Sequence, residues 1–433
     1  MAIPTKQDRR IMHSEIQSAP QSALRVVFVN RYYYPDESAT AQLLTDLAIG
    51  LSAGGIEVHI VCSRQLYENP IARLAAREDA RGVVIHRVWT TRFGRRRLLG
   101  RALDYTSFYI TSAAALIRLL RRTDIVVAKT DPPLISIVAA AAARLKGAFL
   151  INWLQDIFPE VASQLGVMPL PAILGRFLRT LRDTSLRVAK ANVVLGSRML
   201  EYLGTRGVPK SKCKIIENSA DPDLIRAKSI RDSSLRSRLG LTDKFVIGYS
   251  GNLGRAHEYD TILGAAEALQ SDPRFVFLFI GAGANMAALQ SEAELRGMPN
   301  LRFLPYQPRA ELEDSLAAAD LHLVSLIPSL EGLIVPSKFY GILAAGRAVL
   351  FIGDRDGELS RVIRAAHCGL VIAPGNSEAL AEAIRTLEGD RDQLAAMGLA
   401  ARALLCSCFS TKLALASWRT LLTEVADRAT AAV

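Results

Sequence analysis

The stretch SLIPSLEGLIVPSKFYGILAAGRAVLFIG, from Ser325 to Gly353, holds the densest set of chemically useful residues in the chain. Its apolar runs and turn residues predict a buried strand, a loop, a helix and a second strand, at residues 320–326, 327–335, 337–345 and 348–352. Pro336 suits the first turn of that helix, Ser337 can cap it, and Gly346 can end it in the left-handed conformation. The stretch therefore predicts a β-loop-α-β unit of an α/β fold.

Lys338 falls in the first turn of the predicted helix, beside the free backbone N–H groups of the helix start. A lysine there is unfavourable for the helix dipole unless an anion lies in front of it. This pattern predicts a phosphate site, with a solvated lysine as the alternative.

A second candidate for phosphate binding is GYSGNLGRAH, residues 248–257, which follows one predicted strand and precedes a helix. Gly251 and Gly254 would let backbone N–H groups approach a diphosphate, and Arg255 would neutralise it. The alternative is a structural turn. Gly281 and Gly283 end the next strand in the same way.

Length and composition fit a two-domain globular protein, since the chain has 433 residues and is 50% hydrophobic. The five cysteines form no Cys-x-x-Cys pair, which argues against disulfides and zinc knuckles and favours a reducing cytoplasm. No zinc-binding spacing or nucleophile triad occurs, so no metal is expected. Residues 1–23 lack the apolar core of a signal peptide and are expected to be a disordered tail, and no apolar run is long enough to span a membrane.

Strands and helices alternate along the chain twice, with a polar, turn-rich segment between the two series. This order predicts two doubly wound, Rossmann-like domains with parallel sheets. The expected divisions are a first domain, a linker, a second domain and a last helix, at residues 24–220, 221–243, 244–408 and 409–433. Ligands of such sheets bind at the carboxyl ends of the strands, which in the first domain include residues 32–40, 130–133 and 156–160.

The net charge is +11, and the excess of positive charge lies in the first half of the chain. It is concentrated at residues 92–101 and 176–190, where arginines alternate with Leu and Phe at helical spacing. That combination predicts a face that lies on anionic lipid, with ordinary solvated helix faces as the alternative. The residues concerned are Arg92, Arg95, Arg96, Arg97, Arg101, Arg176, Arg179, Arg182 and Arg187, with Phe93, Leu98, Leu99, Phe177, Leu178, Leu181 and Leu186.

These segments resemble the retaining nucleotide-sugar glycosyltransferases of family 4. The likeness is to the subgroup that builds bacterial exopolysaccharide and O-antigen, similar to colanic-acid glycosyltransferases, and it extends over most of the chain from Leu24. The family has two glutamates separated by seven residues. Glu331 stands at the first position, but Gly341 stands at the second, ten residues on. The glutamate that holds the ribose in the wider family is therefore missing.

The resemblance implies the GT-B architecture, in which two Rossmann-like domains face a cleft and the last helix crosses back to the first domain. It also implies that Gly251, Asn252, Gly254, Gly281, Gly283 and Ser337 bind the donor. In the wider family an arginine and a lysine stand where this chain has Asn252 and His257, so Arg255 becomes the expected phosphate contact. The segment NWLQDIFPE is similar to a cleft segment of the subgroup and places Asp156 and Glu160 on the acceptor side; a helix N-cap is the alternative for Asp156.

The activity implied is transfer of a sugar, with retention, from a nucleotide-sugar donor to a polyprenyl-diphosphate-linked saccharide at the inner face of the cytoplasmic membrane. Glu331 would bind the sugar, and Arg255 and Lys338 would stabilise the leaving diphosphate without a metal or other cofactor. One alternative is a nucleotide-sugar 2-epimerase of the same fold. The other is a non-enzymatic, basic membrane- or nucleic-acid-binding protein, although no nucleic-acid-binding module is recognisable and no nucleic-acid partner is expected.

Overall fold

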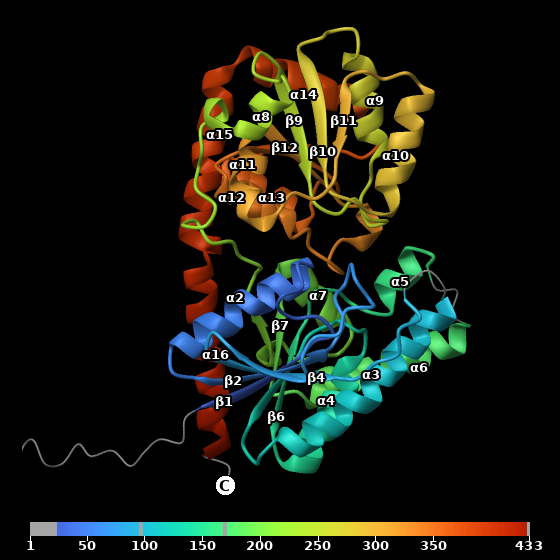
Figure 1. Cartoon of the computed structure of the whole chain (residues 1–433), viewed down its shortest axis with the longest axis vertical. Helices are drawn as coiled ribbons and strands as arrows, with labels where there is room; N and C mark the ends of the chain where they lie inside the picture. Colours follow the sequence, from blue (N-terminus) through green and yellow to red (C-terminus); the bar gives the residue numbers. More distant parts are fainter. Residues whose placement is uncertain (1–23, 95–97, 168–170, 431–433) are drawn as a thin grey trace, which may run out of the picture.

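The computed structural model of the protein describes residues 24–94, 98–167 and 171–430 (Figure 1). The predicted tail at 1–23 and the arginines Arg95, Arg96 and Arg97 lie outside these ranges. Two sheets with helices on both faces form two domains stacked along the long axis, and the C-terminal helices run along one side of both (Figure 1).

The first domain contains an eight-stranded sheet in the order β3-β4-β2-β1-β5-β6-β7-β8. The strands are β1 (Arg25–Val29), β2 (Glu57–Ser63), β3 (Arg77–Ala80), β4 (Val83–Val88), β5 (Ile125–Ala128), β6 (Phe149–Trp153), β7 (Ala191–Val194) and β8 (Cys213–Ile215). β3 is antiparallel to β4, whereas the other neighbours are parallel. The sequence reading misses β3, because its sequence REDA has no apolar strand pattern.

Helices cover both faces of this sheet, as a doubly wound domain requires. They are α2 (Ala39–Ala53), α3 (Leu98–Leu119), α4 (Ile135–Lys146), α5 (Glu160–Gln164), α6 (Ala172–Val188) and α7 (Ser197–Thr205). Successive side chains of β1 point to opposite faces: Val26 and Phe28 pack in the core with α2, whereas Val27 and Val29 pack with α3 and α4.

The second domain contains a six-stranded parallel sheet in the order β11-β10-β9-β12-β13-β14. Its strands are β9 (Phe245–Ser250), β10 (Phe275–Ile280), β11 (Leu301–Leu304), β12 (Leu321–Ser325), β13 (Ala348–Ile352) and β14 (Gly369–Ile372). Its helices are α8 (Ser234–Arg238), α9 (Asp260–Leu269), α10 (Ala284–Leu295), α11 (Leu312–Ala317), α12 (Lys338–Ala344), α13 (Glu358–Ala366), α14 (Ser377–Gly389) and α15 (Arg391–Leu404).

The predicted β-loop-α-β unit is confirmed as β12, α12 and β13, with a short 3-10 turn at Pro328–Leu330 in the loop. Gly346 ends α12 with φ +65°, the conformation that favours glycine. Ser337 makes no side-chain capping bond, because its own backbone is already helical at φ −66° and ψ −23°. The predicted cap is therefore wrong.

The segment predicted as a linker, 221–243, is in large part built into the second domain. Leu235 and Leu241 are buried in a core cluster with β9 and β10. Asp314 accepts hydrogen bonds from the backbone N–H groups of Ser234 (2.9 Å) and Leu235 (2.9 Å). The polar composition of segment 221–243 does not indicate these contacts, because they involve residues far away in the sequence.

The last helix, α16 (Thr411–Thr430), returns to the first domain as predicted. Trp418, Leu421 and Leu422 pack in the same core cluster as β1 and α2. The chain passes from one domain to the other near Ala220 and again near Thr411. These two points are adjacent, because the Thr411 N–H donates to the carbonyl of Ala220 at 3.1 Å. Within the described ranges, no helix is long and apolar enough to cross a membrane.

Candidate functional site

Two glycine-containing loops meet at the carboxyl ends of β9 and β10, which are parallel neighbours. Gly251 N–H donates to the Ile280 carbonyl at 2.8 Å. Gly251, Gly281 and Gly283 have φ values of +114°, +139° and +141°, which other residues rarely adopt. A Cβ atom on Gly281 would lie 2.2 Å from the carbonyl oxygen of Gly251. The glycines are thus needed for the two backbones to approach each other.

Lys338, the first residue of α12, reaches from the neighbouring strand's loop to this glycine pair. Its Nζ donates to the hydroxyl of Tyr249 and to the carbonyl of Asn252 at 3.1 Å, and it lies 3.9 Å from the centre of the Tyr249 ring. A Cβ atom on Gly251 would lie 3.7 Å from its Cε. Burial lowers the pKa of Lys338 well below its ordinary value.

The remaining neighbour of the Lys338 ammonium is His257. The Nδ1 atom of His257 lies 2.6 Å from the carbonyl oxygen of Ser325, so Nδ1 carries the proton and the Nε2 lone pair faces Lys338 at 3.5 Å. Burial, followed by the charge of Lys338, lowers the pKa of His257 to about 3. In the described part of the chain, the partners of Lys338 are therefore all neutral and no carboxylate pairs with it. A half-buried cation without a counter-ion is suited to bind an anion.

Arg255 and Asn252 lie on the same loop and are both exposed. Over the described ranges, Arg255 has no carboxylate or hydrogen-bond partner, so its guanidinium is available to a ligand. A Cβ atom on Gly254 would lie 2.9 Å from Nδ2 of Asn252, so the Asn252 side chain lies close to Gly254. The structure thus brings Gly251, Asn252, Gly254 and Lys338 together, as the sequence predicts.

Glu331 lies where the second domain contacts the first. Its Oε1 accepts a hydrogen bond from the backbone N–H of Glu358 at 2.8 Å. Two residues further on, the Leu333 carbonyl accepts a hydrogen bond from the Ile157 N–H of the first domain at 3.0 Å. Burial, followed by the charges of Glu358 and Asp354, raises the pKa of Glu331. This carboxyl is held in place at the domain interface.

The sequence reading misses two residues beside Glu331. The Oε2 atom of Glu358, at the start of α13, accepts hydrogen bonds from Ser197 Oγ (2.9 Å) and Arg198 N–H (2.8 Å) at the start of α7. Arg198 in turn donates to the carbonyl of Asp356 at 2.8 Å. These hydrogen bonds connect the two domains, and their partners are about 160 residues apart in the sequence. No local sequence pattern could therefore indicate them.

Gly341, at the position of the family's second glutamate, lies one turn after Lys338 on the same side of α12. A Cβ atom there would meet only Leu316 Cδ1, at 3.9 Å. A side chain could therefore begin at this position without a clash of its Cβ atom.

Asp156 follows β6 and forms an antiparallel backbone bridge with Ile334 of the second domain. Its Oδ1 is buried and, within the described residues, has no hydrogen-bond partner. Burial raises the pKa of Asp156 to about 6, and a hydrogen bond from Thr130 opposes the shift. The N-cap alternative is wrong, because α5 begins at Glu160 with Pro159 as its N-cap.

Glu160 is engaged within the first domain. It accepts hydrogen bonds from Arg182 Nη1 (3.1 Å) and Nη2 (2.9 Å) and from the Tyr202 hydroxyl (2.7 Å). Since these partners occupy both carboxylate oxygens, Asp156 is the better placed of the two predicted acceptor-side acids to contact a ligand.

Lys129, at the end of β5, is a buried charge that the sequence reading misses. It is 1% exposed, donates to the Thr40 carbonyl at 2.6 Å and lies 4.0 Å from the centre of the Trp153 ring. Burial lowers the pKa of Lys129 to about 7, while Asp131 opposes the shift. Lys129 and Asp156 line the same small cavity at the strand ends of the first domain.

We expect Asp156→Asn to stabilise the ligand-free protein above pH 6. The folded-state pKa of about 6 lies above the unfolded value, so the folded state favours the neutral acid and loses stability as pH rises through 6. One pKa unit corresponds to about 1.4 kcal/mol, which limits the gain to about 3 kcal/mol. Urea unfolding at pH 4.5 and pH 8 measures it; equal effects at both pH values would contradict the assignment.

Two family models match the chain: "Glycosyl transferase 4-like domain" over residues 39–219 and "Glycosyl transferases group 1" over residues 232–404. Among solved structures, Anabaena HepE in complex with UDP and glucose superposes with a TM-score of 0.70 at 16% identity, covering 93% of this chain and 100% of HepE. The fold and the family models together define a GT-B glycosyltransferase.

Together the two models account for most of the chain, which belongs to glycosyltransferase family 4. It is 28% identical to the probable glycosyltransferase WbjE of Pseudomonas aeruginosa over 293 residues, 68% of this chain and 73% of WbjE. It is 25% identical to WcaI of Escherichia coli K12, a putative colanic acid biosynthesis glycosyl transferase, over 84% of this chain and 91% of WcaI.

Proposed function

We propose that this protein is a retaining glycosyltransferase of bacterial surface-polysaccharide synthesis. It transfers a sugar from a nucleotide-sugar donor to a saccharide linked to polyprenyl diphosphate, at the inner face of the cytoplasmic membrane. The observation that carries the proposal is Lys338, a half-buried ammonium that has only neutral partners and lies against the glycine loops. The names of WbjE and WcaI, and the UDP and glucose in HepE, support the substrate classes.

In this mechanism the bond between the anomeric carbon and the diphosphate oxygen breaks. The acceptor hydroxyl attacks from the same face, and its proton passes to the departing phosphate oxygen. Lys338 and Arg255 stabilise the charge on that diphosphate, which requires no protein base and no metal. Glu331 holds the sugar, and Asp156 lies toward the acceptor. Among the described residues, no cluster of three or more metal-binding side chains occurs.

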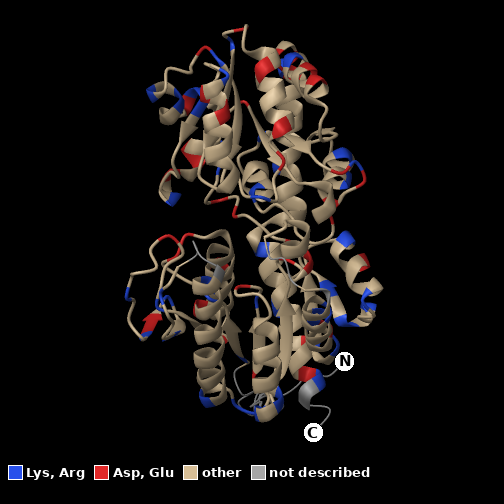
Figure 2. Cartoon of the chain, turned by 90° about the vertical axis from the view of Figure 1, so that its right-hand side faces the viewer, with Lys and Arg blue, Asp and Glu red and all other residues tan. Residues whose placement is uncertain are grey.

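The membrane part of the proposal depends on exposed side chains of α3 and α6. Apolar side chains are exposed on α3, on α6 and in the segment before α3, and Figure 2 shows both charged residues and long uncharged helical stretches on this side of the first domain. We call this set the apolar face: Phe93, Leu99, Leu103, Ile110, Ile173, Leu174 and Phe177. Arg176 is exposed beside it.

Two residues expected on that face lie elsewhere. Arg182 is 4% exposed and is paired with Glu160 and Asp183, and Leu186 is buried in a core cluster. The helical periodicity of α6 places both on the inner side, so their predicted contact with lipid is wrong.

The test of the proposed function is turnover of a nucleotide-sugar panel with and without a lipid-linked acceptor extract. Transfer of sugar to lipid supports it. Donor epimerisation without an acceptor would indicate the 2-epimerase instead, and no turnover of any donor would contradict the enzyme assignment for these substrates.

We expect the product to keep the anomeric configuration of the donor. Glu331 is held by the Glu358 N–H at the domain interface, and the donor's own phosphate oxygen serves as base in the proposed mechanism. NMR coupling constants of the new linkage decide the question. An inverted centre would require a protein carboxylate as base, with Asp156 the first candidate, and would rule out the retaining mechanism.

A further inference from the structure

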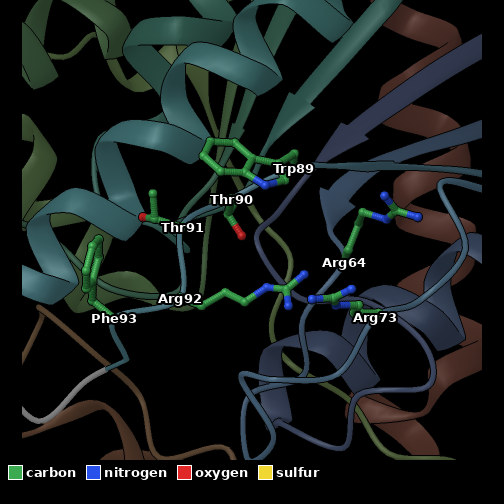
Figure 3. A pocket seen from close by; sticks show the side chains of 7 residues that line it. All are labelled: Arg64, Arg73, Trp89, Thr90, Thr91, Arg92 and Phe93. Carbon is green, nitrogen blue, oxygen red and sulfur yellow. The ribbon is translucent and has the colours of Figure 1, made fainter.

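A pocket of about 610 Å³ opens in the first domain, and the residues that line it all belong to that domain (Figure 3). Arg64 and Arg73 come from the segment after β2, and Trp89, Thr90, Thr91, Arg92 and Phe93 come from the segment after β4. β2 and β4 are parallel neighbours, so both segments leave the sheet at its carboxyl edge. The volume lies within the range of small-molecule sites.

Three guanidinium groups converge in this pocket, and no carboxylate lines it. In Figure 3 the side chain of Arg92 extends toward Arg73, and Arg64 lies beside them. Arg64 Nε donates to the Leu74 carbonyl at 2.9 Å, whereas Arg73 and Arg92 have no hydrogen-bond or carboxylate partner in the described part of the chain. Like charges gathered in a concave site repel one another until an anion binds, and guanidinium groups bind phosphate oxygens in pairs.

Apolar surface adjoins the three arginines. Trp89 is 58% exposed, although the other two tryptophans, Trp153 and Trp418, are buried. The Trp89 carbonyl accepts a hydrogen bond from Thr111 Oγ1 of α3 at 2.9 Å, which fixes the pocket beside the apolar face. Phe93 belongs both to the pocket and to that face. A ligand held here would thus join a phosphate group to a hydrocarbon chain.

We propose that the Arg64, Arg73 and Arg92 pocket binds the diphosphate of the lipid-linked acceptor, whose prenyl chain leaves past Phe93 toward the membrane. This inference rests on the proposed function and assigns the part of the acceptor that the first domain recognises. The residues that would hold the donor diphosphate, Lys338 and the glycine loops, belong to the second domain and are not among those that line the pocket.

Geranylgeranyl diphosphate is the probe, and protection of Trp89 from acrylamide quenching is the readout, checked by calorimetry. We expect Arg73→Gln and Arg92→Gln each to weaken binding roughly tenfold and the double variant about 100-fold, as for the loss of charge-assisted bonds. Arg77→Gln is the matched control, since Arg77 is exposed on β3 and does not line the pocket; it should bind as the wild type does.

Three comparison ligands identify the source of the anion. Geranylgeraniol should bind at least tenfold more weakly than its diphosphate; equal binding would overturn the role of the arginines. Inorganic diphosphate that bound as tightly as the prenyl compound would identify a free-anion site instead. Loss of affinity for phosphatidylglycerol vesicles in the double variant, with unchanged affinity for the probe, would identify a phospholipid headgroup site.

Probe binding requires no turnover, so the inference and the proposed function can fail separately. Sugar transfer to lipid by a double variant with wild-type acceptor KM would overturn the pocket and leave the function intact. Where both hold, the double variant raises the KM for the acceptor and leaves the KM for the donor unchanged.

Discussion

Lys338→Met is expected to lower kcat roughly 10²- to 10³-fold, the range found when a preorganised charge contact in the transition state is removed. The ammonium has only neutral partners in Tyr249, Asn252 and His257, and in the proposed mechanism the leaving diphosphate is its counter-ion. Arg255→Ala is expected to have an effect of similar size through the same phosphate. Steady-state rates with the natural donor measure both.

Stability separates this catalytic role from a structural one. Burial lowers the pKa of Lys338 below its unfolded value, so without a bound anion the folded state disfavours the charged form. Lys338→Met should therefore raise the free energy of unfolding of the ligand-free protein, most at low pH and less as pH rises toward the unfolded pKa of about 10.4. A lysine that supports the fold would show the opposite sign.

A matched control for Arg255 is Arg302, which is exposed on β11 of the same domain. Arg302→Ala should keep wild-type kcat and unfolding free energy, because exposed substitutions change stability little. Near-normal kcat in Lys338→Met and Arg255→Ala would remove both residues from the mechanism.

Local sequence predicts that Gly251, Gly281 and Lys338 lie together, because their contacts follow from single strand-loop-helix units. Gly251, Gly281 and Lys338 each stand directly after a strand or at a helix start, and parallel strands bring those points to one edge. Glycine is required at position 281, because a Cβ atom there would lie 2.2 Å from the carbonyl oxygen of Gly251.

The interface around Glu331 depends on contacts that no local pattern contains. The bond from Glu358 N–H to Glu331, and those from α7 to Glu358, depend on how the two domains meet. Lys129 was not identified from the sequence, and the structure places its ammonium against the Trp153 ring. Such buried charges are determined by packing between elements, which periodicity cannot supply.

The second large effect is expected on membrane binding, when apolar residues of the apolar face are replaced by aspartate. We expect the triple variant Leu99→Asp, Ile173→Asp and Phe177→Asp to lower partition onto phosphatidylglycerol vesicles at least about 100-fold. Leu99 and Ile173 are 82% and 83% exposed, so their side chains are available to lipid. Burial of a large apolar side chain contributes about 1.5–3 kcal/mol, and each arginine near an anionic leaflet adds about 1 kcal/mol.

Salt dependence and a matched control distinguish binding through the apolar face from non-specific adsorption to vesicles. High salt should weaken wild-type binding, since part of the attraction comes from arginines such as Arg176. Leu295→Asp is the control, because Leu295 is 87% exposed but lies on α10 of the second domain; its partition should equal that of the wild type. Vesicle sedimentation measures all three proteins, and circular dichroism checks their folding. A wild-type protein that stays in the supernatant, or an equal loss in Leu295→Asp, would show that α3 and α6 do not form the membrane contact.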